Sequence, residues 1–152
     1  THRPEEQRGQ HQNHRHIEAG ERSRVDHRPG SEQRAACGPD FIQLSGNDET
    51  ALAFNAMGGV GCVSVTANVA PRLCAEFQAA LAAGDYALAL SYQDRLYPLH
   101  IAMFTDASPG PVKYALGRVR PGFPTELRLP MTPAGEASRT AVDAALAHAG
   151  LI

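Results

Sequence analysis

Apolar side chains are distributed very unevenly along this chain, and their distribution limits where a folded core can form. Residues 1–40 contain no Leu, Phe, Tyr, Met or Trp, and Ile17 and Val25 are their only branched aliphatic residues. From Phe41 onward the chain is rich in Leu, Ala and Val. A segment with so little apolar surface cannot offset the entropy that it loses on ordering. We therefore expect residues 1–36 to be disordered and the fold to begin near residue 37.

Composition excludes several classes of protein. No apolar run approaches the ~20 residues that a membrane-spanning helix needs, and the first thirty residues lack the apolar stretch of a secretory signal. A formal net charge of -2 provides no global field that would attract nucleic acid. The three cysteines, Cys37, Cys62 and Cys74, are an odd number at irregular spacings, unlike a disulfide framework. These features favour a cytoplasmic protein with neither membrane nor nucleic-acid partners.

Three histidines near the start of the chain, His11, His14 and His16, raise the question of a metal site. His-rich tracts can bind zinc or nickel, but no Cys or acidic ligand set accompanies these three. The arginines of the same segment are interleaved with acids that nearly cancel their charge, which argues against an RNA-binding arm. We predict no metal and no cofactor for this chain.

Residues 37–69 contain two short apolar segments with a helical stretch between them. The segments FIQL at 41–44 and CVSVT at 62–66 have the composition of strands. Asn47 and Asp48 are candidate caps for the helix between them, and GGVG at 58–61 ends it. These glycines follow a helix and not a strand, so they do not form a dinucleotide-binding fingerprint. A strand, a crossover helix and a strand make a βαβ unit with parallel pairing.

Residues 70–152 have the pattern of helices throughout. Pro71 suits a first helical turn, Gly84 ends that helix, and Asp85 can cap the next one. Pro98 should kink or break this second helix. Thr132 is the expected cap of a last helix, which ends at Gly150. Two strands followed only by helices would leave both sheet edges open, so the chain reads as the end of a larger α/β fold.

Several motifs in register resemble one enzyme family. They are FIQLSGND at 41–48, GGVGCVSVTANVAP at 58–71, RLYPLH at 95–100, PVKYAL at 111–116 and LRLPMTP at 127–133. Over residues 35–152 the chain resembles 4-hydroxy-tetrahydrodipicolinate synthase, also called dihydrodipicolinate synthase. N-acetylneuraminate lyase and the keto-deoxy-sugar-acid aldolases share its scaffold, so a related pyruvate aldolase is an alternative.

The resemblance implies a (β/α)8 TIM barrel with a C-terminal helical extension, usually assembled as a homotetramer. Residues 37–69 match only the last two strands of that barrel, and residues 70–152 match the extension. The family condenses pyruvate with aspartate semialdehyde in lysine and diaminopimelate biosynthesis, a lyase reaction that passes through a lysine Schiff base. Barrel chemistry lies at the carboxyl ends of the strands. There the resemblance places Gly46 and Val63 in the pyruvate pocket.

The family's catalytic residues find no match in this sequence. Its Schiff-base lysine belongs to the sixth strand, which would fall near Glu21, where no lysine stands. Its relay tyrosine and its arginine belong to earlier strands. Lys113, the only lysine of the chain, matches a position with a structural role. We expect no catalytic residue here and a chain that is inactive alone. Residues 1–30 have the composition of a shifted reading frame in a GC-rich gene, a hypothesis that the upstream DNA would test.

Two further interpretations stay open. The chain would be a non-catalytic, truncated paralogue whose helices bind another protein, or it would be completed by a separately encoded N-terminal half that supplies the lysine. Cys62, Cys74 and His100 lie in apolar contexts, so we expect them to be packed and not catalytic.

Overall fold

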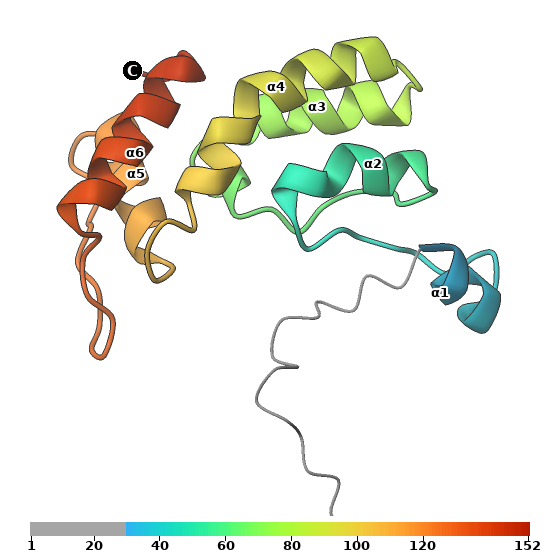
Figure 1. The fold of residues 1–152 in the computed structure, drawn as a ribbon, viewed down its shortest axis with the longest axis horizontal. Helices are drawn as coiled ribbons and strands as arrows, with labels where there is room; N and C mark the ends of the chain where they lie inside the picture. Colours follow the sequence, from blue (N-terminus) through green and yellow to red (C-terminus); the bar gives the residue numbers. More distant parts are fainter. Residues whose placement is uncertain (1–29) are drawn as a thin grey trace, which may run out of the picture.

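The computed structural model describes residues 30–152, and its regular elements are helices (Figure 1). In chain order they are α1 (Gly30–Cys37), the 3-10 helix η1 (Asp48–Thr50), α2 (Ala51–Ala56), the 3-10 helix η2 (Thr66–Asn68), α3 (Pro71–Ala82), α4 (Tyr86–Ala102), α5 (Gly110–Val119) and α6 (Glu136–His148). The disorder predicted for residues 1–36 falls mostly outside the described residues, and the end of that segment forms α1. The three N-terminal histidines and the position of Glu21 also lie outside them.

The two segments predicted as strands run parallel, yet neither forms a strand within residues 30–152. They meet in one isolated parallel bridge between Ser45 and Cys62. The Ser45 N–H donates to the Gly61 carbonyl at 2.9 Å, and the Val63 N–H donates to the Ser45 carbonyl at 2.8 Å. The Val60 N–H donates to the Gln43 carbonyl, one residue out of the regular parallel register, so no ladder forms on the amino-terminal side of the bridge. The predicted direction of pairing is confirmed, and the predicted strands are wrong.

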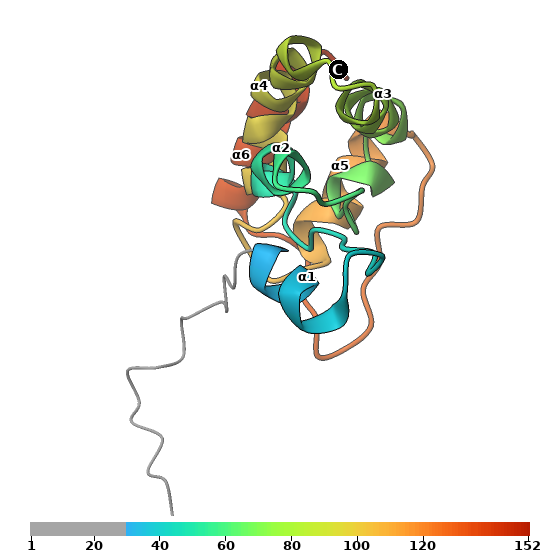
Figure 2. The same ribbon diagram turned by 90° about the vertical axis from the view of Figure 1, so that its right-hand side faces the viewer.

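The core is made by the helices that follow. α3 and α4 lie side by side, α4 also packs on α6, and α6 packs on α5 (Figures 1 and 2). α4 is therefore the central element of the core. The largest fully buried side chains are those of Leu96, Leu99, Met103, Leu146, Val142, Thr66 and Pro111. α1 stands apart from these helices in Figure 1 and is joined to the first paired segment by Gln43, whose Nε2 donates to the Gly30 carbonyl at 2.8 Å.

Most helix ends follow the predicted caps. The Asp85 carboxylate accepts a hydrogen bond from the Leu88 N–H at 3.0 Å, as expected of the N-cap of α4. Gly84 ends α3 with φ of 74°, a left-handed conformation that glycine adopts without steric cost. Thr132, however, is not the cap of the last helix, because α6 begins only at Glu136. Thr132 precedes a proline, and a residue in that position favours extended backbone.

The sequence predicts that Pro98 kinks or breaks its helix. Pro98 lies inside α4, which continues through it to Ala102, so the helix is not broken there. Proline has no N–H and leaves the carbonyl four residues earlier, that of Asp94, without its helical partner. The Nε2 atom of His148 in α6 lies 3.3 Å from that carbonyl oxygen. When Nε2 carries its proton, α6 supplies the hydrogen bond that Pro98 removes.

Candidate functional site

Gly46 and Val63, the two predicted pocket residues, lie at the same edge of the paired segments. Each follows directly after one member of the bridged pair, Ser45 and Cys62. Val63 is 68% exposed, and a Cβ atom added at Gly46 would meet no other atom within 4 Å. Parallel segments end at one edge, so the structure brings the two positions together there. Both are open to solvent in the described part of the chain.

The first paired segment has one polar, buried face and one apolar, exposed face. Gln43 and Ser45 are buried, whereas Ile42 and Leu44 are 71% and 53% exposed. This is the reverse of the pattern of a surface strand, which turns its polar residues to water. Val63 adds to the exposed apolar group from the second segment. An exposed apolar face of this kind is typical of a surface that another structural element covers.

Asp48 joins the two segments just beyond this edge. Its side chain is 6% exposed, and its Oδ2 accepts hydrogen bonds from the Val65 N–H at 2.9 Å and the Thr66 N–H at 3.2 Å. The Cys62 thiol donates to its Oδ1 at 3.7 Å. The sequence predicts Asn47 and Asp48 as helix caps. Asn47 does occupy the N-cap of η1, but it makes no side-chain capping bond, and Asp48 instead satisfies donors of the second segment.

Helix α4 contacts this cluster, formed by Asp48 and its hydrogen-bond donors, through two side chains. The Nδ1 atom of His100 lies 2.8 Å from the Thr66 hydroxyl, and the Gln93 Nε2 donates to the Glu49 carbonyl at 3.2 Å. His100 is 2% exposed, which confirms its prediction as a packed residue. Its Nε2 has no hydrogen-bond partner in the described part of the chain. A cavity of about 240 Å³ adjoins the cluster and is lined by Asp48, Cys62, Ser64, Cys74 and His100 among others.

The two cysteines beside this cavity are poor nucleophiles. Burial, followed by the nearby Asp48 carboxylate, raises the pKa of Cys62 to about 12 and the pKa of Cys74 to about 11. Thiolates, not thiols, attack electrophiles. Both thiols therefore stay protonated at neutral pH. Cys74 is buried, as predicted, whereas Cys62 is only partly buried.

Lys113 lies in α5, and its ammonium group is held by a loop. Its Nζ donates to the carbonyl of Glu126, in the segment that follows α5. Within residues 30–152, no hydrogen bond joins the Lys113 side chain to the edge at Gly46 and Val63. Within the same residues, no group of three or more His, Cys, Asp or Glu side chains is placed to hold a metal ion. None of the described helices has both the length and the apolarity to cross a membrane.

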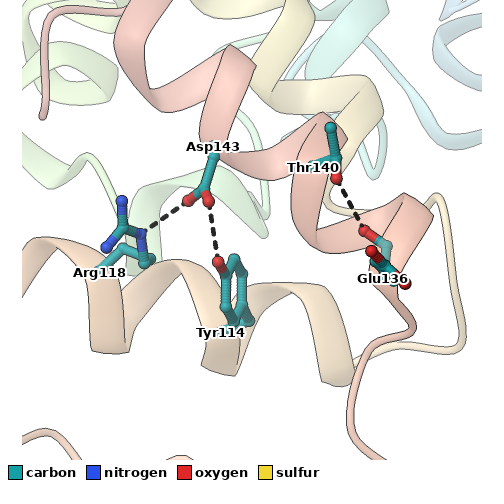
Figure 3. Close-up of polar contacts among 5 residues, drawn as sticks. All are labelled: Tyr114, Arg118, Glu136, Thr140 and Asp143. Atoms are coloured by element: carbon teal, nitrogen blue, oxygen red, sulfur yellow. Dashed lines mark hydrogen bonds and ion pairs between the residues drawn. The ribbon is translucent and has the colours of Figure 1, made fainter.

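A second polar cluster joins α5 to α6 (Figure 3). Asp143 accepts a hydrogen bond from the Tyr114 hydroxyl at 2.9 Å and pairs with Arg118 at 2.7 Å. The guanidinium of Arg139 lies 5.5 Å from the centre of the Tyr114 ring. Burial, followed by the hydrogen bond to Asp143, raises the pKa of Tyr114, so the phenol keeps its proton. This cluster links two helices of the core and contains neither Gly46 nor Val63.

The stability of the chain is expected to fall in mild acid because of His100. Burial lowers its pKa below the ordinary value of 6.5, although the carboxylates of Asp48 and Glu49 oppose the shift. The unfolded state therefore binds the proton more readily, so stability is lost as the pH falls below 6.5 toward the folded-state pKa. Urea denaturation between pH 5 and 8 measures this loss, and the His100→Gln variant corrects for all other groups. Identical pH profiles for the two proteins would contradict the expectation.

Two comparisons of sequence identify relatives of this chain. The sequence model of the dihydrodipicolinate synthetase family matches residues 25–149. The chain is 71% identical over 121 residues to a 4-hydroxy-tetrahydrodipicolinate synthase of Rhizorhabdus wittichii, a match that covers 80% of this chain and 42% of the relative. The corresponding enzyme of Zymomonas mobilis is 65% identical over 122 residues, with the same two shares.

Solved structures give the same result. A dihydrodipicolinate synthase from Thermotoga maritima matches with a TM-score of 0.74 and 35% identity, over 81% of this chain and 41% of that one. A chloride-inhibited dihydrodipicolinate synthase from Acinetobacter baumannii, complexed with pyruvate, matches with a TM-score of 0.74 and 36% identity, over 81% and 42%. These neighbours are TIM-barrel enzymes. The chain spans about two fifths of the length of the relatives that it matches, in their C-terminal part.

Proposed function

Because this chain belongs to the dihydrodipicolinate synthetase family, we propose that it forms the C-terminal wall of a pocket where pyruvate condenses with aspartate semialdehyde. The observation that carries the proposal is the edge at which Gly46 and Val63 follow the bridged pair and stay open. In enzymes of this type the backbone around the matching positions lines the pyruvate pocket. The product enters lysine and diaminopimelate biosynthesis, and we expect the reaction to take place in the cytoplasm.

The proposed reaction needs an amine at this edge. The amine attacks the ketone carbon of pyruvate and water leaves. The methyl carbon of the resulting iminium then loses a proton, and the enamine so formed attacks the aldehyde carbon. A buried lysine with a lowered pKa is suited to this task. Lys113 is the only lysine among the 152 residues, and its ammonium group is bound to the Glu126 carbonyl in a loop. We propose that these 152 residues alone form no Schiff base at the pocket.

A complementary polypeptide portion that carries the lysine would complete the site. The exposed apolar face supports this proposal, because Ile42, Leu44 and Val63 offer apolar surface on the paired segments. Burying such a face contributes roughly 25 cal/mol per Å² of apolar area, which favours association with further strands. A separately encoded N-terminal half is the partner that fits this surface, and a homotetramer is the assembly expected of the completed enzyme.

Schiff-base trapping with borohydride tests both proposals. The chain incubated with pyruvate and borohydride is expected to gain no adduct on Lys113. The chain mixed with the N-terminal part of the Rhizorhabdus wittichii synthase is expected to direct a trapped adduct to a lysine of that partner. The adduct adds the mass of pyruvic acid less one oxygen atom, because water leaves and hydride reduces the iminium. Intact mass and a peptide map locate it and separate it from reaction at the terminal amine.

Two variants sharpen this test. Gly46→Leu should fold normally, since the space at Gly46 is open, but its side chain would crowd the pocket and reduce trapping in the mixture. Lys113→Arg should trap as the unsubstituted chain does. A trapped adduct on Lys113 in the chain alone would show that the chain carries its own pyruvate chemistry. A mixture that associates but traps no pyruvate would overturn the proposal of complementation.

A further inference from the structure

We infer that Asp48 is a positioning residue, whose carboxylate fixes the ends of the two paired segments and so sets the relative placement of Gly46 and Val63. The consequence for pyruvate binding rests on the proposed function. The placement itself rests only on the contacts of the described residues. Asp48 does not touch the reacting atoms and acts through the two backbone positions that it holds.

The position of Asp48 matches the geometry of the edge. Asp48 comes two residues after Gly46, and Val65, one of its donors, comes two residues after Val63. Gly46 therefore lies along the chain between the bridged Ser45 and Asp48. Val63 likewise lies between the bridged Cys62 and Val65, whose N–H is bound to the Asp48 carboxylate. A regular sheet would hold the segment ends with further ladder bonds, but the bridge is isolated. The carboxylate takes over the function of the missing ladder beyond the bridge.

Helix α4 holds both segments near Asp48 through hydrogen bonds to Thr66 and Glu49. Thr66, which donates its N–H to Asp48, has its hydroxyl on His100. Glu49, the residue after Asp48, accepts from Gln93 through its carbonyl. Gln93 and His100 are two turns apart on one helix, so they present their side chains from the same face of α4. The edge is thereby tied to the helix that packs on both α3 and α6.

The chemistry of the donors explains why a carboxylate suits this position. An ionised Asp only accepts hydrogen bonds, and here it faces two backbone N–H groups and one thiol. Alanine would leave the two backbone N–H groups and the thiol without this hydrogen-bond partner. Asparagine keeps one acceptor oxygen for the two backbone donors. Asp48→Asn is therefore the conservative variant and Asp48→Ala the disruptive one.

Amide hydrogen exchange on the full chain tests the placement directly. In Asp48→Ala, the amides of residues 63–66 are expected to exchange roughly tenfold faster or more, while amides of α6 keep their rates. Asp48→Asn should retain most of the protection. Asp85→Ala is the matched control, because Asp85 also accepts a backbone N–H but caps the far end of α4. Unchanged exchange at 63–66, or equal acceleration throughout the core, would overturn the inference.

Kinetics of the completed enzyme test the consequence for the substrate. In the mixture with the Rhizorhabdus wittichii N-terminal part, Asp48→Ala is expected to raise KM for pyruvate roughly tenfold and to change kcat much less. Asp48→Asn should restore KM, and Asp85→Ala should leave both constants unchanged. An unchanged KM in Asp48→Ala would contradict the positioning role. If the unsubstituted mixture is inactive, the proposed function fails, and hydrogen exchange alone decides whether Asp48 fixes the edge.

Discussion

Replacement of Leu96 by alanine is expected to lower the free energy of unfolding by about 2–5 kcal/mol. Leu96 is 0% exposed and lies in α4, the helix that packs on both α3 and α6. Truncation removes buried methyl groups and leaves a cavity that the surrounding helices fill only in part. Urea denaturation followed by far-UV circular dichroism measures the change, as a lower midpoint with an unchanged slope.

Leu90→Ala is the matched control for this prediction. The same substitution is made in the same helix, so the change in helix propensity is shared, but Leu90 is 51% exposed. Its expected cost is below about 1 kcal/mol, since little buried surface is lost. Equal losses for Leu90→Ala and Leu96→Ala would show that α4 is not packed at the centre of the core.

Thr66→Val is expected to lower the free energy of unfolding by about 1–3 kcal/mol, although the two side chains have almost the same shape. Thr66 is fully buried, and its hydroxyl is the hydrogen-bond partner of His100 Nδ1 at 2.8 Å. The other ring nitrogen of His100 already has no partner among the described residues. Valine would leave both ring nitrogens buried without a hydrogen bond. The same urea titration measures the loss of stability.

Thr140→Val provides the control for Thr66→Val. The Thr140 hydroxyl donates to the Glu136 carbonyl at 3.0 Å within α6 (Figure 3), and the side chain is exposed. Water can replace that bond, so the expected change stays within about 0.5 kcal/mol. Thr66→Ser keeps the hydroxyl and should retain more stability than Thr66→Val. A Thr66→Val chain as stable as the unsubstituted one would contradict the prediction.

The helices of this fold are predictable from sequence because their signals are local. The Asp85 cap and the turn at Gly84 involve residues within one helical turn of the ends that they define. The strands depend on pairing, and a shift of one residue between Val60 and Gln43 suffices to end a ladder. Neither segment has a local sequence pattern that predicts this shift in register. Pro98 illustrates the same limit, because the side chain that compensates for it, His148, lies far along the sequence.

Some residues of the candidate site are likewise predictable from the sequence, and others are not. Gly46 and Val63 are identified through a family resemblance, and their placement at one edge follows from parallel pairing. Asp48 has the sequence context of a helix cap, and its backbone donors lie 17 and 18 residues further along the chain. The sequence does show Asp48 after a strand-like segment, and Ser64 and Thr66 before the start of a helix. Such a signal becomes informative only when the two segments are known to be neighbours.

The contact between His148 and the Asp94 carbonyl has a consequence for how the chain folds. The second half of α4 contains a proline and is missing one of its own hydrogen bonds until α6 is in place. Formation of that half is therefore coupled to docking of α6. We therefore expect α4 and α6 to acquire their final structure as one cooperative unit and not one helix at a time.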